Sequence, residues 1–171
     1  MKQLTVFRVL TFILLPIAAM FGFIDVIFIL SSLANPALLF IAFILAAFVI
    51  YTFASLKFLS KSLDTGRPSS PSLRDWIRVN AFVSLFMGIM FLLNSLTVFF
   101  ANDITLRQYL SQFMESQPKV PSMLTPELFL TMMKIMAYFM FFISVMLLIH
   151  IRLNFRIMKK HAYLFDPPAA E

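Results

Sequence analysis

Apolar residues form four long runs along the chain, which cover residues 9–30, 37–56, 79–101 and 128–151. A helix rises about 1.5 Å per residue, so about 20 mostly apolar residues are needed to cross a hydrocarbon layer about 30 Å thick. Each run reaches that length. The pattern therefore predicts an all-α, polytopic integral membrane protein, a bundle of four transmembrane helices arranged as two antiparallel hairpins.

The segment between the third and fourth runs has the pattern of a shorter helix. Apolar residues from Leu106 to Met114 repeat at the spacing of one helical face, and the opposite face is polar. This predicts an amphipathic helix over 103–116 that lies in the membrane interface. Residues 1–165 are expected to form a single membrane domain, followed by a disordered tail at 166–171.

Two helix starts carry capping signals. Ser72 is followed three residues later by Asp75, which is the pattern of a capping box. Thr125 precedes Pro126, which suits the N-cap and the first position of a helix. We expect the third helix to begin near Ser72 and the fourth near Pro126.

Lysines and arginines predict the orientation, because they are retained on the cytoplasmic side. Eleven of the 14 lie at the amino terminus, in the loop between the second and third runs, or at the carboxyl end: Lys2, Arg8, Lys57, Lys61, Arg67, Arg74, Arg78, Arg152, Arg156, Lys159 and Lys160. Both termini and that loop are therefore predicted to be cytoplasmic. The compact loops and the basic inner side favour the plasma (inner) membrane of a bacterium.

Composition supports a lipid environment and excludes several classes of function. The chain is 61% hydrophobic and 13% charged, against about 45–50% and about 25% in soluble domains. The net charge of +6 resides at helix ends, which suits anionic lipid headgroups and argues against a nucleic-acid partner. The chain has no cysteine, and its scattered acidic residues form no enzyme motif, so we predict no catalytic residue, no metal site and no cofactor.

Polar residues inside the spans are the candidates for function, because their burial in lipid is costly. Asp25 and Lys134 both lie on the order of 10 Å below the outer surface, at about 1.5 Å per residue. With Arg107 and Asn94 they form a predicted intramembrane polar site, in which the aspartate pairs with one of the two cations and responds to protons or cations. The alternative is a structural ion pair, or a lysine extended to the headgroups beside a solvated aspartate.

A second set of small or weakly polar residues is expected to line helix contacts. This predicted packing face consists of Ala18, Gly22, Asn80, Ser84 and Gly88. The one histidine within a span, His150, stands two residues from Arg152. We expect it to lie at the inner interface as an amphipathic residue with no metal or proton role.

Three functions agree with these features. The main prediction is a non-catalytic subunit or assembly factor of a membrane complex, because small-residue faces, an interfacial helix and short loops suit a protein that packs against other membrane subunits or against its own copies. One alternative is a small transporter or channel component with its polar site at Asp25 and Lys134. A second alternative is a lipid-binding or lipid-modifying membrane protein.

Overall fold

The structure, a computed structural model, describes residues 2–116 and 125–165. These residues are mostly helical and contain no strand. Four helices are long and apolar enough to cross a membrane: α1 (Lys2–Ser32), α2 (Leu38–Phe58, continued as a π-helix over Leu59–Leu63), α3 (Pro71–Phe100) and α5 (Pro126–Lys160). The predicted all-α class and the four long apolar helices are confirmed. The predicted tail at 166–171 lies outside the described residues.

The helices extend beyond the apolar runs, chiefly at their basic ends. The fourth run was bounded at 151, whereas α5 continues to Lys160. Hydropathy marks only the part of a helix that suits lipid, and the helix itself continues until its backbone hydrogen bonds stop. A span read from hydropathy is therefore a lower bound on helix length.

One of the two predicted caps is confirmed and the other is wrong. The Thr125 hydroxyl oxygen accepts a hydrogen bond from the backbone N–H of Leu128 at 3.2 Å, as an N-cap should. At the start of α3, the hydroxyl that accepts from the N–H of Leu73 belongs to Ser70, at 3.3 Å, and Ser72 is already helical. Pro71 explains the difference, because its fixed φ suits the first helical position and moves the start forward.

The chain divides into two compact units. The first comprises Met1–Gly88 and Met146–Glu171. It holds α1, α2, the first part of α3 and the last part of α5. The second unit comprises Ile89–Val145 and holds the rest of α3, the short helix α4 (Asp103–Ser116) and the start of α5.

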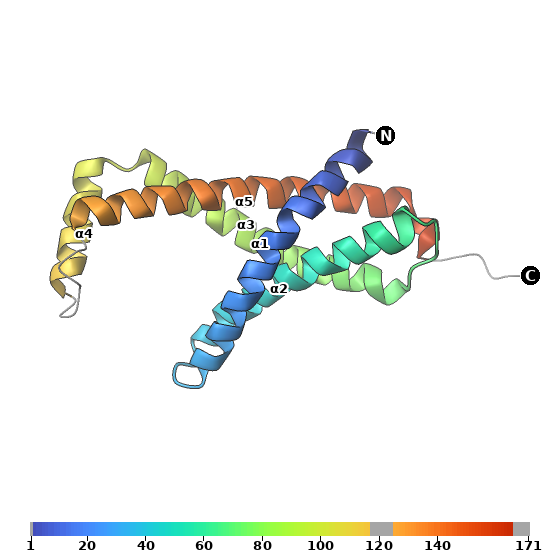
Figure 1. Ribbon diagram of the computed structural model, residues 1–171, viewed down its shortest axis with the longest axis horizontal. Helices are drawn as coiled ribbons and strands as arrows, with labels where there is room; N and C mark the ends of the chain where they lie inside the picture. Colours follow the sequence, from blue (N-terminus) through green and yellow to red (C-terminus); the bar gives the residue numbers. More distant parts are fainter. Residues whose placement is uncertain (1, 117–124, 166–171) are drawn as a thin grey trace, which may run out of the picture. The chain divides into compact units, whose positions relative to one another are not determined.

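In the first unit, α1 and α2 form an antiparallel hairpin (Figure 1). The turn between them is closed by Asn35, whose side-chain oxygen accepts from the N–H of Ala37 at 3.2 Å. Large apolar side chains such as Phe23, which is 73% exposed, point away from the unit. The buried side chains of α1 repeat every three, four or seven residues, which is one helical face: Phe7, Thr11, Leu14, Ala18, Asp25 and Ser32.

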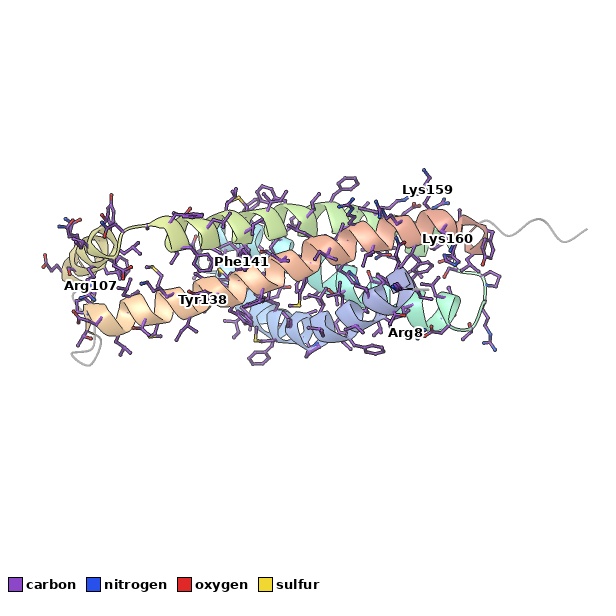
Figure 2. All side chains as sticks on the ribbon, turned by 90° about the horizontal axis from the view of Figure 1, so that it is seen from above. Arg8, Arg107, Tyr138, Phe141, Lys159 and Lys160 are labelled. Carbon is purple, nitrogen blue, oxygen red and sulfur yellow. The ribbon has the colours of Figure 1, made fainter. Side chains whose placement is uncertain are left out.

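One end of the first unit is closed by a short carboxyl-terminal 3-10 turn, Ala162–Leu164. Its Leu164 carbonyl accepts from the N–H of Ser69 at 2.6 Å, and the next residue, Phe165, stacks on Phe58 with ring centroids 5.1 Å apart. Arg8 of α1 forms an ion pair with Asp64 of the loop after α2. Figure 2 shows Arg8 at the same end of this unit as Lys159 and Lys160.

The second unit is held together by rings and ion pairs. Phe99 of α3 packs against Tyr138 and Phe141 of α5, with centroids 4.8 and 5.7 Å apart. Figure 2 labels the two residues of α5. Helix α4 has the predicted bounds, 103–116, and the side chain of Asn102 caps it by accepting from the N–H of Ile104 at 2.9 Å. Placement of α4 in the membrane interface stays a prediction.

Candidate functional site

A polar cluster lies at the centre of the first unit, where α1, α2 and α5 meet around His150. The imidazole is fully buried. Its Nε2 lies 2.9 Å from the hydroxyl of Thr11 on α1, and its Nδ1 lies 2.7 Å from the hydroxyl of Tyr51 on α2. One turn further along α5, the Asn154 amide donates to the hydroxyl of Ser55 at 2.7 Å and to that of Tyr51 at 3.4 Å. We call Thr11, Tyr51, Ser55, His150 and Asn154 the histidine cluster.

The hydrogen bonds of the cluster have a single consistent direction. The Thr11 hydroxyl donates to the carbonyl of Phe7 at 2.8 Å, so its oxygen accepts from Nε2–H of His150. The other ring nitrogen, Nδ1, then accepts a hydrogen bond from the phenolic O–H of Tyr51. Each hydroxyl thus donates once, and the imidazole is neutral with its proton on Nε2.

Apolar packing surrounds these bonds. Phe7 stacks on the imidazole at a centroid distance of 4.7 Å and an interplanar angle of 18°. Thr11, Tyr51, Ser55 and His150 have no exposed surface. In a dry interior a satisfied polar network is strong and fixes the register of the helices that contribute to it. The cluster is therefore a lock, by which we mean that its hydrogen bonds fix three helices relative to one another. One polar atom is not satisfied: Oδ1 of Asn154 receives no hydrogen bond from the described residues.

The expectation that His150 is an amphipathic surface residue was wrong, because its side chain is fully buried where three helices meet. Its position near the inner membrane interface stays a prediction. Arg152 is exposed while His150 is buried. Residues two apart on a helix point about 200° from one another, so a charged neighbour says little about the side on which a histidine lies.

Asp25, the predicted acid, is buried on the inner face of α1 with 7% of its surface exposed. Its Oδ1 receives no hydrogen bond from the described residues. Nearby packing is apolar: a Cβ added to Gly22 would lie 3.6 Å from the methyl groups of Val49, and Phe21 meets Phe48 edge to face at 5.7 Å. Asp25 is therefore a buried acid in an apolar helix contact.

Both predicted cations have carboxylate partners within the second unit. Nζ of Lys134 lies 2.7 Å from Oδ1 of Asp103, and Nη1 of Arg107 lies 3.3 Å from Oε1 of Glu127. These two pairs join α4 to α5. The predicted grouping of Asp25 with these cations spans the two units and stays a prediction, but each cation already has a partner of opposite charge.

Asn94 lies beside an apolar groove of about 310 Å³ between α3 and α5. Its side-chain amide donates to the carbonyl of Met90 at 2.9 Å. Apart from Asn94 and Ser95, the groove is lined by apolar side chains: Val98, Phe129, Met132, Met133, Met136, Ala137 and Met140. The groove thus offers apolar contact rather than a polar binding site.

All residues of the predicted packing face belong to the first unit, and most of them are buried there. Ala18, Asn80, Ser84 and Gly88 are buried, and Gly22 is half-buried. A Cβ added to Gly88 would lie 3.3 Å from a methyl group of Leu148, so α3 and α5 approach closely there. These contacts agree with a packing role, although none of them tests a function.

Sequence reasoning missed the histidine cluster, although it carries a signal. On α2 and α5 the cluster residues are four positions apart: Tyr51 and Ser55, and His150 and Asn154. On α1, Thr11 stands four positions after Phe7, which stacks on the imidazole. The polar members follow or precede a basic residue by two to six positions, at Arg8, Lys57 and Arg152. Polar residues that lie within a few positions of the basic end of each helix indicate one layer of a bundle.

In residues 2–116 and 125–165, no three histidine or acidic side chains gather where they could hold a metal ion. No protein-family model, no curated protein sequence and no solved structure matches the chain.

Proposed function

We propose that this protein is a non-catalytic subunit or assembly factor of a membrane complex, inserted with both termini and the loop around Asp64 in the cytoplasm. In this proposal the chain supplies a rigid helical body against which other membrane polypeptides, or further copies of the chain, pack. Its basic end lies against anionic headgroups of the inner leaflet.

The observation that carries this proposal is the histidine cluster. Its donors are used in bonds between helices or to neighbouring carbonyls, so the polar groups serve to hold α1, α2 and α5 together. Large apolar side chains occupy the outer faces of the same helices, for example Phe12, Phe43 and Ile149. A locked interior with an apolar exterior is the construction expected of a packing subunit.

The proposed orientation predicts the accessibility of two exposed positions. Because the chain has no cysteine, Thr65→Cys and Gln112→Cys each create a single thiol, and both side chains are exposed. A membrane-impermeant maleimide applied to intact cells should label the thiol at 112 and should label the thiol at 65 only after permeabilisation. Equal labelling at both positions in intact cells would show that the orientation is wrong.

The subunit proposal is tested by stoichiometry and dependence. A tagged full-length chain, extracted from native membranes in a mild detergent, should carry another membrane polypeptide, or a second copy, in fixed stoichiometry. Removing the chain should lower the amount of that polypeptide in the membrane, and the wild-type chain should restore it. A matched chain with His150→Ala, which loosens the lock, should restore it less well than one with Ile149→Ala, which changes only the exposed neighbour.

A contrary result is equally clear. If the chain is monomeric in mild detergent, and if its removal changes the amount of no other membrane protein, the subunit proposal fails. Flux of a solute or ion in liposomes that contain only this chain would then favour the transporter alternative. The buried carboxyl of Asp25 is the observation that favours this second candidate, because intramembrane acids commonly mark ion or proton paths.

A further inference from the structure

Several acidic side chains in the described residues form ion pairs, and Asp25 differs from them. Asp64, Asp103 and Glu127 have cationic partners and are exposed. Asp25 is 93% buried, as its exposed fraction of 7% implies, and its Oδ1 has no hydrogen-bond donor among the described residues. An ionised carboxylate in this position would lose hydration without gaining a hydrogen-bond donor at Oδ1, which disfavours the charged form.

Cations of the first unit are too far away to compensate. On α1 the nearest is Arg8, seventeen residues and therefore about 25 Å away. On α2, Val49 faces Gly22, and Lys57 lies eight residues beyond Val49, in the direction away from Asp25. His150 lies at the level of Thr11, fourteen residues along α1 and about 21 Å from Asp25. The hydroxyl of Tyr51, the other titratable group on these helices, is bound to His150. The charged residues of α3 and α5 in this unit lie at or beyond that level.

Other spans show how a neutral side chain of this shape is satisfied. Asn80 and Asn94 have the same heavy-atom skeleton as aspartic acid, and each donates to the carbonyl four residues earlier, at 2.8 and 2.9 Å. Thr52 and Ser84 make the equivalent bond. A protonated carboxyl at Asp25 has an O–H that can donate to the carbonyl of Phe21 in the same way, whereas a carboxylate has no donor.

We propose that Asp25 is a proton-binding site within the membrane: its carboxyl group takes up one proton and holds it at neutral pH, in the apolar contact between α1 and α2. The ligand is the hydrogen ion itself, and no second carboxylate and no metal is needed. This inference does not depend on the chain being a subunit, because the site is built from α1 and α2 alone.

The direct test is infrared spectroscopy of the full-length protein in lipid nanodiscs at neutral pH. The carbonyl stretch of a protonated carboxyl should be present in the wild type, absent in Asp25→Asn, and unchanged in the matched control Asp103→Asn, whose carboxylate is exposed and paired. N,N′-dicyclohexylcarbodiimide, an apolar reagent for protonated carboxyls, gives a second measurement. The acid proton moves to one reagent nitrogen while the carboxyl oxygen bonds to the central carbon, and rearrangement leaves a stable N-acylurea on Asp25.

Stability of the substituted protein completes the test. Asn keeps the shape and the donor of a protonated aspartic acid, so Asp25→Asn should unfold at nearly the wild-type temperature across neutral pH. If the wild type lacks an Asp25-dependent protonated carboxyl, the proposal is overturned. In that case the group is ionised and its counter-charge lies outside the first unit. A polypeptide that co-purifies with the wild type but not with Asp25→Asn would show that the counter-charge comes from another chain.

Discussion

Replacing His150 with alanine should destabilise the protein by about 3 kcal/mol, the largest effect expected of a single substitution within the spans. The change removes a fully buried ring that stacks on Phe7 and leaves a cavity between three helices. It also removes the acceptor of the Tyr51 hydroxyl and the donor to Thr11, so two buried polar groups lose their partners at once.

The loss can be measured by reversible unfolding in mixed detergent, followed by the fluorescence of Trp76, the one tryptophan of the chain. Ile149→Ala is the matched control, because it truncates the preceding side chain, which is 46% exposed. That variant should lose less than about 1 kcal/mol, as substitutions at exposed positions usually do. Equal losses at 149 and 150 would show that the cluster is not a lock.

Tyr51→Phe separates the hydrogen bonds from the packing. It keeps the buried ring and removes only the hydroxyl that donates to Nδ1 of His150 and accepts from Asn154. Hydrogen bonds between membrane helices contribute about 0.6 kcal/mol on average and up to about 1.7, so a loss near the upper value is expected here. In the double variant with His150→Ala the two losses should not add, because both substitutions break the same bond.

The spans could be predicted from sequence because lipid imposes a length and a composition that a single chain displays by itself. The short helix α4 was predicted for a similar reason, since its apolar period is local. Its cap at Asn102 was not predicted, although that signal is local as well. Helix ends were less predictable. The start of α3 depended on which of two nearby serines, Ser70 or Ser72, preceded the first turn. Helix α5 continues to Lys160, beyond the end of its apolar run.

The candidate site was harder to predict, because it depends on contacts between helices distant in sequence. His150 meets Thr11 across 139 positions, and nothing in one sequence states that α1 and α5 are neighbours. Asp25 was found because an acid in a long apolar run is costly wherever its neighbours are. A partner for Asp25 could not be predicted in the same way. The predicted cation Lys134 forms an ion pair with Asp103, the first residue of α4, because the chain reverses between α3 and α5 and brings α4 alongside α5.

Truncating Phe165 should open the carboxyl-terminal cap of the first unit. This ring has no exposed surface, stacks on Phe58, and lies beneath the guanidinium of Arg74, whose central carbon is 5.9 Å from the ring centroid. Loss of a buried phenylalanine costs about 3 kcal/mol or more. Because the residue belongs to a terminal turn, we expect most of this loss to appear as local opening and not as unfolding of the helices.

The absence of natural cysteines makes the opening measurable. In a background with Ser62→Cys, the single thiol is buried beside Ser69, whose N–H binds the carbonyl of Leu164 in the cap. Its reaction with a small maleimide reports how often the cap opens. Phe165→Ala should accelerate the reaction about 100-fold, since about 1.4 kcal/mol corresponds to a factor of ten. Tyr163→Ala is the control: it truncates a ring in the same turn that is 62% exposed, and it should change the rate little. If Phe165→Ala reacts no faster than the background variant, Phe165 does not hold the cap, and the backbone bond from Ser69 to Leu164 is sufficient without it. Equal acceleration in both variants would show that the effect is not specific to the buried ring.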